Sequence, residues 1–320
     1  MATACLVYAA PASATAPDRN IVHLQATLDR LGFSPGVIDG QKGAMLIKAL
    51  KGLQIARGLP ASGTLDAKTI AYLQPFSVTP GTIEVTLSQA DVAGPYQGPI
   101  PKDEAAQARL PALGYASLTE RLSERYHTTP DMLIALNGGD ASLAAGAKLI
   151  VPNVVPASRD YAADMKPDWK AMVADLNVGA PQPAAAKVVV DKSEGVLRAY
   201  DAGGKLIAQF PATTGSKHDP LPIGTWKIQG ESTLPEFHYN PRLFWDASKD
   251  KGKQTLPPGP NGPVGVVWLD LSKPHYGIHG TPEPATIGRT QSHGCIRLSN
   301  WDVARLALTV KPGTPAVFQP

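Results

Sequence analysis

The stretch that decides the fold of the C-terminal part of this chain is Ser292-His293-Gly294-Cys295-Ile296-Arg297, which follows Tyr276-Gly277-Ile278-His279-Gly280-Thr281 at a short distance. A thiol becomes a useful nucleophile when a neighbouring base or positive group lowers its pKa and draws off its proton. His279 and His293 lie near enough in the sequence to serve Cys295 in this way. The two stretches together predict a cysteine nucleophile with a histidine base.

The residues beside Cys295 fit the same chemistry. Gly294 lets a substrate carbonyl approach the backbone and leaves N–H groups to face a developing oxyanion. Arg297 lies two residues past the thiol, on the same face if the chain is extended there, where its guanidinium can hold a substrate carboxylate. The stretch therefore predicts a nucleophile together with groups that hold its substrate.

Two other interpretations of these residues stay open. A lone cysteine is more often a buried small apolar residue than a catalyst. A zinc site is the second alternative, because His275 and His279 lie four residues apart on an expected strand and share a face, with His293 and Cys295 as further ligands. No Asp or Glu in these motifs is an obvious general base for a metal mechanism. We therefore favour the nucleophile, with no metal and no cofactor.

Residues 185–320 resemble the L,D-transpeptidase catalytic-domain family. The resemblance rests on His279 and the Ser292–Arg297 stretch, and it extends upstream through Thr214-Gly215 and Leu221-Pro222-Ile223-Gly224-Thr225-Trp226. Leu221 stands where threonine is common in the family. The resemblance implies a mostly-β, β-sandwich-like domain.

The resemblance also implies a role for each motif residue. Cys295 is the nucleophile, which forms a thioester with a peptidoglycan stem peptide, and His279 takes up and returns the proton. The remaining roles are orientation of the imidazole by the Gly280 carbonyl, an oxyanion hole of N–H groups around His293, Gly294 and Cys295, and substrate binding by Ser292 and Arg297. Members of the family cut after the third stem residue, release the terminal D-amino acid and pass the acyl group to a side-chain amine of a neighbouring stem.

The segment 230–263 is long for a connection between strands and carries several aromatic residues before a Pro/Gly run. Loops of this length in compact domains are often lids. We expect it to cap the substrate groove, with Trp245 contacting the stem peptide. Tyr276, three residues before His279, is expected to contact the peptide as well. The alternative is a separate small hydrophobic cluster. The remaining histidines, His23, His127, His218 and His238, have no partner pattern and are expected at the surface or in loops.

Residues 18–76 predict three short helices, with apolar residues at helical spacing and Thr64 as N-cap of the third. The run through Gly36-Val37-Ile38-Asp39-Gly40 to Ser62-Gly63-Thr64-Leu65 resembles the three-helix peptidoglycan-binding module. A generic helical bundle is the alternative. Residues 77–114 are rich in Pro, Gly and Ala and predict a linker with one strand near 83–87.

Residues 115–153 predict two capped helices followed by a strand at Lys148-Leu149-Ile150-Val151-Pro152. This pattern resembles a LysM module, a small α+β sugar-chain binder. Its usual Gly-Asp-Thr-Leu opening is replaced here by Gly114-Tyr115-Ala116-Ser117-Leu118. Residues 154–184 are expected to form a second linker or a docking segment. The fold class is therefore multi-domain: a small all-α bundle, a LysM-like module and a mostly-β catalytic domain.

Composition limits the compartment and the partners. The chain has 320 residues and a net charge of +3, too small and too dispersed to indicate a nucleic-acid partner. Residues 1–17 resemble the end of a secretory signal, with an apolar run before small residues, and are too short to span a membrane. The two cysteines are Cys5 and Cys295, so removal of this segment would leave a single thiol.

These observations predict an exported enzyme of the periplasm or cell wall that acts on peptidoglycan stem peptides. Its two modules would hold the glycan, and it would form cross-links between third stem residues. A wall-anchored protein is a further possible acyl acceptor. An L,D-carboxypeptidase or endopeptidase using the same cysteine, and a non-catalytic wall-binding scaffold, are the alternatives.

Overall fold

The computed structural model describes residues 17–248 and 250–320, so the expected signal-like segment lies outside the described residues apart from Pro17. Three helices form the N-terminal module, α1 (Arg19–Arg30), α2 (Ala44–Ala56) and α3 (Ala67–Leu73), followed by the short 3-10 helix η1 (Gln74–Phe76). The third helix is capped by Asp66, whose carboxylate accepts from Thr69 N at 2.8 Å. The prediction of Thr64 as this cap was wrong, because the cap lies two residues later, at Asp66.

The next part of the chain forms two antiparallel strands with four helices between them, two of four residues and two of eight, which we call the middle module (residues 82–152). Strand β1 (Thr82–Thr86), from the expected linker, pairs with β2 (Lys148–Pro152). The hydroxyls of Ser117 and Thr129 cap the two helices, as their sequence pattern predicts. The helices of this part are α4 (Gln89–Val92), α5 (Glu104–Gln107), α6 (Leu118–Arg125) and α7 (Pro130–Asn137).

One eight-stranded sheet dominates the C-terminal domain, in the order β11-β10-β9-β6-β12-β3-β4-β5. The domain is mostly β, as expected, but it is a single curled sheet rather than a sandwich of two. The long strand β6 causes the curl, because it pairs with β12 near Gly224 and, after an irregularity at Ile228, with β9. The strands are β3 (Lys187–Asp191), β4 (Val196–Tyr200), β5 (Leu206–Pro211), β6 (Gly224–Thr233), β9 (Val267–Leu271), β10 (Gly277–His279), β11 (Ile296–Arg297) and β12 (Pro315–Gln319).

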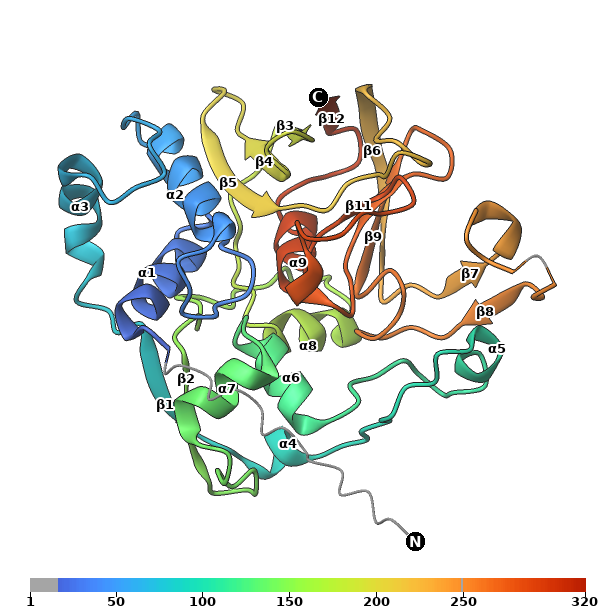
Figure 1. Cartoon of the computed structure of the whole chain (residues 1–320), viewed down its shortest axis with the longest axis horizontal. Coiled ribbons are helices and arrows are strands. Elements are labelled where there is room, and N and C mark those ends of the chain that lie inside the picture. Colours follow the sequence, from blue (N-terminus) through green and yellow to red (C-terminus); the bar gives the residue numbers. More distant parts are fainter. Residues whose placement is uncertain (1–16, 249) are drawn as a thin grey trace, which may run out of the picture.

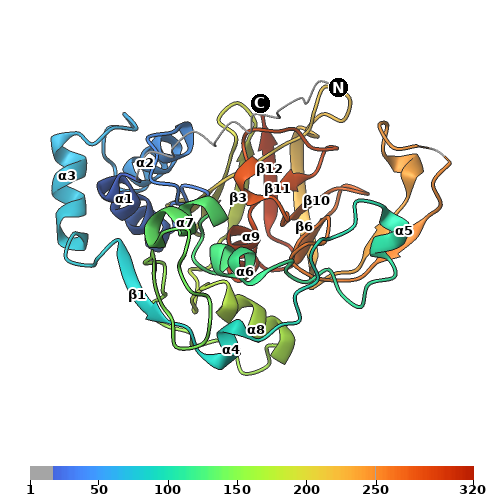
Figure 2. The same ribbon diagram turned by 60° about the horizontal axis from the view of Figure 1, so that its bottom comes forward.

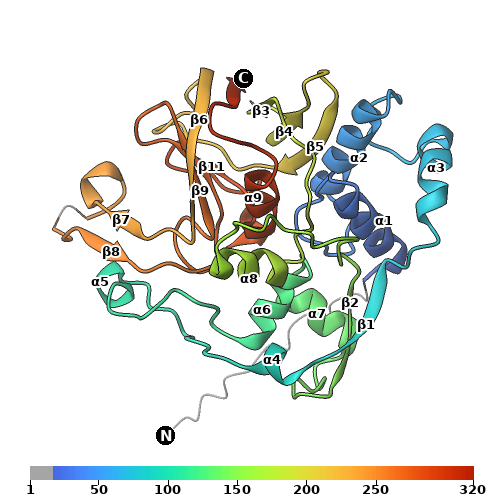
Figure 3. The same ribbon diagram turned by 180° about the vertical axis from the view of Figure 1, so that it is seen from behind.

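Two helices pack against the sheet and complete its core (Figures 1 and 3). Helix α9 (Asn300–Ala307) is capped by Ser299, whose hydroxyl accepts from Asp302 N, and it buries Trp301 completely. Helix α8 (Pro167–Asp175) buries Trp169 in the same core. The segment 154–184, expected to be a linker or a docking segment, thus contributes to the core of the catalytic domain.

A small hairpin projects from the domain beside the middle module's α5 (Figure 1). Strand β7 (Phe237–Tyr239) pairs with β8 (Gln254–Leu256), and the 3-10 helix η2 (Pro241–Leu243) lies between them. Lys251 forms an ion pair with Glu104 of α5 at 2.5 Å. Another 3-10 helix, η3 (Pro284–Thr286), lies in the loop that follows β10. Of the helices in residues 17–248 and 250–320, none is both long and apolar enough to cross a membrane.

The three parts meet at a buried polar junction. Asp29 of α1, with no side-chain exposure, contacts His127 Nδ1 at 3.1 Å and Arg305 of α9 at 3.1 Å. His127 also contacts the Leu176 carbonyl through Nε2 at 2.7 Å. His127 lies in the turn after α6, as expected of a loop residue, but it is fully buried, so the expectation of a surface position was wrong. Figure 2 shows α1, α6, α7 and α9 gathered around this region.

Candidate active site

Two neighbouring strands bring the predicted catalytic residues onto one face of the sheet. Strands β10 and β11 are parallel, with His279 opposite Arg297. Side chains of paired residues point to the same face, and residues two apart on a strand share that face. Cys295 lies two residues before Arg297, at the entrance to β11. The register therefore places His279, Arg297 and Cys295 together.

The orientation of His279 is set by its own backbone neighbour. Its Nδ1 lies 2.7 Å from the carbonyl oxygen of Gly280. A carbonyl only accepts, so this contact assigns the proton to Nδ1 and leaves Nε2 with the lone pair that a base needs. The ring is buried. Burial, and then the charge of Arg297, lower the pKa of His279 to about 4, although its hydrogen bond to Gly280 opposes them.

Cys295 is half-buried beside the strand that carries His279. Burial raises the pKa of its thiol, opposed by a hydrogen bond from the Gly277 backbone and by the charge of Arg297. Its Sγ lies 3.8 Å from the carbonyl oxygen of His275. Because the thiol pKa is raised and the imidazole pKa is lowered, both groups are neutral near pH 7. This pairing suits a base that takes the thiol proton during attack rather than a preformed ion pair.

The turn before Cys295 requires glycine. Gly294 has φ +102°, a region that side chains disfavour, and a Cβ there would lie 2.7 Å from the ring of Tyr276. Ser292 fixes the same turn, since its Oγ donates to the Cys295 carbonyl at 2.6 Å and accepts from Gly294 N at 3.2 Å. The N–H of Gly294, predicted to face an oxyanion, is therefore engaged by Ser292 in this structure.

Arg297 is positioned by backbone bonds rather than by an acid. Its N–H donates to the Thr213 carbonyl at 2.9 Å, and its carbonyl accepts from Thr213 N at 3.0 Å. Within the described part of the chain, no carboxylate forms a salt bridge with its guanidinium. Burial lowers its pKa, and the nearby Cys295, Glu283 and Asp246 oppose that shift. A half-buried cation without an acidic partner suits an anionic substrate group.

The β7–β8 hairpin reaches the site through aromatic and polar contacts. His293 Nε2 lies 2.9 Å from Asp246, and the Phe244 ring meets the His293 ring edge-on with centroids 5.1 Å apart. Trp245 is 55% exposed and stacks on His218 at 4.3 Å. The long segment that the sequence singled out as a lid therefore contacts the residue next to Gly294.

Two features differ from the sequence prediction. Trp268 of β9 pairs with His279 in register and stacks on its ring, with centroids 5.4 Å apart. The sequence analysis did not single out Trp268; the strand alternation of Val267–Leu271 was the only available signal. His275, expected on the same strand face as His279, instead has φ +67° in the turn before β10. The shared-face argument for a zinc site was therefore wrong.

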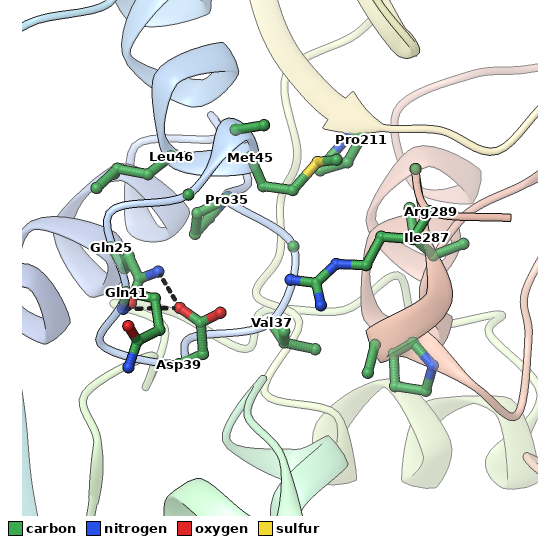
Figure 4. Close-up of a pocket in the computed structure, with 16 residues that line it drawn as sticks. Gln25, Pro35, Val37, Asp39, Gln41, Met45, Leu46, Pro211, Ile287 and Arg289 are labelled. Carbon is green, nitrogen blue, oxygen red and sulfur yellow. Dashed lines mark hydrogen bonds between the residues drawn. The ribbon is translucent and has the colours of Figure 1, made fainter. Parts of the chain in front are cut away.

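A cavity of about 140 Å³ is lined by the N-terminal module on one side and by the loop that joins His279 to Ser292 on the other. Figure 4 shows Gln25 and Asp39 on one wall and the guanidinium of Arg289 pointing across from the other. Where the loop carries Gly288, a Cβ would lie 2.3 Å from the terminal methyl of Met45. The N-terminal module therefore packs directly on the loop that leads to Cys295.

Comparison with known families agrees with this geometry. Residues 185–318 match the family described as "L,D-transpeptidase catalytic domain". The chain contains an L,D-transpeptidase catalytic domain. Residues 17–73 match the family described as "Putative peptidoglycan binding domain", so the N-terminal module is a domain of this family rather than a generic bundle. The transpeptidase domain and this module together indicate peptidoglycan as the substrate.

Named relatives share the assignment. The transpeptidase is 29% identical over 205 residues to "Putative L,D-transpeptidase YkuD" of Bacillus licheniformis, covering 63% of this chain and 93% of the relative. It is 28% identical over 141 residues to "Probable L,D-transpeptidase YbiS" of Escherichia coli K12, covering 43% of this chain and 46% of the relative. A solved structure, "L,D-transpeptidase from Mycobacterium smegmatis", is 23% identical and covers 42% of this chain and 58% of that chain, with a TM-score of 0.34.

Proposed function

We propose that this chain is an exported peptidoglycan L,D-transpeptidase that joins third residues of stem peptides through a thioester on Cys295. The observation that carries the proposal is the shared face of Cys295 and His279, with the His279 tautomer fixed by the Gly280 carbonyl at 2.7 Å. A neutral thiol beside a neutral imidazole supplies what acyl transfer needs: a nucleophile that carries a proton and a free Nε2 that can accept it.

The reaction proceeds in two halves. Cys295 Sγ attacks the carbonyl carbon of the third stem residue while its proton passes to His279 Nε2. The tetrahedral intermediate collapses, the terminal D-amino acid leaves with that proton on its amine, and the thioester remains. An acceptor amine then attacks the thioester and gives a proton to His279, which returns it to the departing sulfur. No net proton is gained or lost over the cycle.

Backbone and side-chain groups around the thiol hold the substrate. N–H groups around His293 and Gly294 stabilise the oxyanion, for which the Gly294 N–H exchanges its bond to Ser292 for one to the intermediate. Arg297 binds a stem carboxylate, and Trp245 with Tyr276 packs on the peptide. The lid contact between His293 and Asp246 supports this arrangement, because it ties the hairpin to the oxyanion turn.

The two N-terminal parts hold the enzyme on the wall polymer. The peptidoglycan-binding module borders the loop that leads to Cys295, so a glycan bound there places its stems near the thiol. The middle module, whose helices α6 and α7 lie between the paired strands β1 and β2, serves as a LysM-like glycan binder. The cell wall or periplasm is the compartment in which this substrate occurs.

The decisive experiment incubates the protein with a tetrapeptide-stem muropeptide beside a Cys295→Ala control. Intact mass spectrometry follows the protein, and chromatography follows the products. An acyl adduct on the unmodified chain alone, together with a dimer linked between third residues, supports transpeptidation. An adduct with only tripeptide product replaces the proposal with an L,D-carboxypeptidase. The absence of both adduct and turnover in folded protein favours a wall-binding scaffold.

A further inference from the structure

Helix α6 of the middle module touches the helix that follows the catalytic cysteine. Asn300, the first residue of α9, donates from Nδ2 to Glu124 Oε1 at 2.8 Å. Glu124 belongs to α6, outside the transpeptidase domain, and its other oxygen accepts from the Tyr115 hydroxyl at 2.9 Å. Asn300 is fully buried and Glu124 is 5% exposed. This contact is therefore a specific, water-shielded link between two parts of the chain.

Asn300 in turn lies against the backbone that orients the catalytic imidazole. Its Oδ1 accepts from Val266 N at 3.2 Å. A Cβ added to Gly265 or Gly280 would lie 2.0 or 2.2 Å from that oxygen, so both backbones pass Asn300 in close contact. Gly280 is the residue whose carbonyl holds His279 Nδ1. The orientation of Asn300 thus limits where the Gly280 peptide can lie.

Both polar atoms of the Asn300 amide are hydrogen-bonded, which fixes the orientation of the amide. Besides Glu124, its Nδ2 donates to the Pro260 carbonyl at 3.1 Å. The loop that carries Pro260 is itself bonded to the middle module, since Leu113 N donates to the Pro258 carbonyl at 2.8 Å and Asn261 Nδ2 to the Gly114 carbonyl at 2.9 Å. Loss of the Glu124 acceptor would leave one of the two buried N–H groups of Nδ2 without a partner, which is unfavourable and favours rotation of the amide.

We propose that Glu124 is a positioning residue for His279, acting through Asn300 and the Gly280 backbone, so that the middle module completes the catalytic site. The proposal rests on the proposed function for its activity readout. It goes beyond that function because it assigns a catalytic contribution to a part of the chain that otherwise only binds the wall.

The charge state of Glu124 follows from its surroundings. The groups that face it are Tyr115, Asn300 of α9, Glu120 of its own helix, and Asp175 at the end of α8. Burial, with smaller contributions from Glu120 and Asp175, raises the pKa of Glu124 to about 8, although hydrogen bonds from Tyr115 and Asn300 oppose the shift. Glu124 is therefore neutral at pH 7, when its Oε2–H can donate to the Tyr115 oxygen while Oε1 still accepts from Asn300, and glutamine is its close isostere in that state.

The test compares Glu124→Met, Glu124→Gln and the control Glu84→Gln, a change at an exposed ion pair of the same module. All carry Cys5→Ser, so that Cys295 is the only thiol. We measure kcat and KM on the tetrapeptide muropeptide, the pH dependence of Cys295 alkylation by iodoacetamide, and thermal unfolding. Alkylation needs no peptidoglycan, so it separates a failure of this proposal from a failure of the proposed function.

We expect Glu124→Met to lower kcat about tenfold with KM within twofold, and to move the alkylation profile to higher pH. Glu124→Gln keeps the acceptor, so its kcat should stay within threefold of the parent's at pH 7. If the kcat of the parent declines above about pH 8, that decline should be absent in Glu124→Gln. Folded Glu124→Met with unchanged kcat and alkylation profile would overturn the proposal. If Glu124→Met does not fold, an unchanged alkaline limb in Glu124→Gln overturns it.

Discussion

The imidazole of His127 lies flat against the indole of Trp301, with ring centroids 5.0 Å apart and planes 7° apart. His127 belongs to the middle module and Trp301 to the transpeptidase domain, and both are fully buried. Asp29 of the peptidoglycan-binding module contacts the same His127 ring through Nδ1. This buried stack, with the ion pair between Asp29 and Arg305 beside it, joins three parts of the chain, unlike binding modules on flexible linkers.

Asp29→Asn should destabilise the whole chain rather than one module. Removing the charge leaves Arg305 buried without its partner, and breaking a buried pair costs about 3–5 kcal/mol. Asparagine retains part of the hydrogen bonding, so we expect a loss of about 3 kcal/mol at pH 7. Chemical denaturation followed by fluorescence and circular dichroism measures it. Two separate transitions in the parent chain would contradict a single cooperative unit.

The same substitution has a predictable pH dependence. The charges of Arg305 and His127 lower the pKa of Asp29 below its ordinary value of 3.8, against the opposing effect of burial. A lowered carboxyl pKa stabilises the fold above the unfolded-state pKa, and this stabilisation declines as the pH falls toward the folded-state pKa. The difference in unfolding free energy between Asp29→Asn and the parent should therefore narrow below about pH 4. The exposed pair Lys148–Glu84 provides the control, with Glu84→Gln showing little change at any pH.

Activity should persist to unusually low pH. Because the pKa of His279 is lowered to about 4, the imidazole remains neutral through pH 5 and is protonated only below that. The acylation rate should fall on the acid side near pH 4, not near the ordinary histidine value of 6.5. Rapid-mixing mass spectrometry of Cys295 acylation measures this limb. A half-maximal rate at pH 6 or above, in folded protein, would contradict the prediction.

Arg297→Gln tests the cause of that shift. The charge of Arg297 is the second contribution after burial to the lowered pKa of His279. Its removal should move the acid limb upward by a fraction of a pH unit, and it should raise KM if the guanidinium binds a stem carboxylate. Arg289→Gln, on the loop beside the 140 Å³ cavity, is the matched control and should leave the acid limb in place.

Trp268 should affect the rate of chemistry more than substrate affinity. Its ring stacks on His279 and covers Gly277, where a Cβ would lie 2.4 Å from the indole. Trp268→Ala should free the imidazole to move and lower kcat about tenfold, because a displaced base loses its alignment. Trp268→Phe should retain most of the rate. Equal kcat in the parent and folded Trp268→Ala would show that the Gly280 carbonyl alone holds the ring.

Local patterns predicted the parts of this structure that local forces determine. The caps at Ser117, Thr129 and Ser299 are each satisfied within one helical turn, so the sequence is enough to find them. The mostly-β character of the C-terminal domain was expected from its resemblance to the transpeptidase family. The curl of the sheet at Ile228 is not local, because it depends on which strands pair with each half of β6.

The contacts that unite the modules could not be predicted in this way. Asp29, Glu124 and His127 lie more than a hundred residues before their partners in α9, and no periodicity marks them as buried. A polar residue on a predicted helix is ordinarily assigned to solvent, and only the tertiary structure shows that these face a partner. His279 and Cys295, by contrast, stand in short motifs whose chemistry is readable directly.

Trp245 should contribute to substrate binding and not to chemistry. It is 55% exposed, and its only ring partners in the described part of the chain are His218 at 4.3 Å and His293 at 6.3 Å. Truncation therefore removes little buried area, and Trp245→Ala should unfold at the parent's temperature. If the ring packs on the stem peptide, KM should rise about tenfold with kcat within twofold, because a contact made equally in the ground and transition states changes only KM. His218→Ala, which removes the stacking partner but not the indole, should produce a smaller rise in KM. Steady-state kinetics on the tetrapeptide muropeptide decide the matter, and an unchanged KM in Trp245→Ala would assign these aromatics to a hydrophobic cluster that serves the hairpin alone.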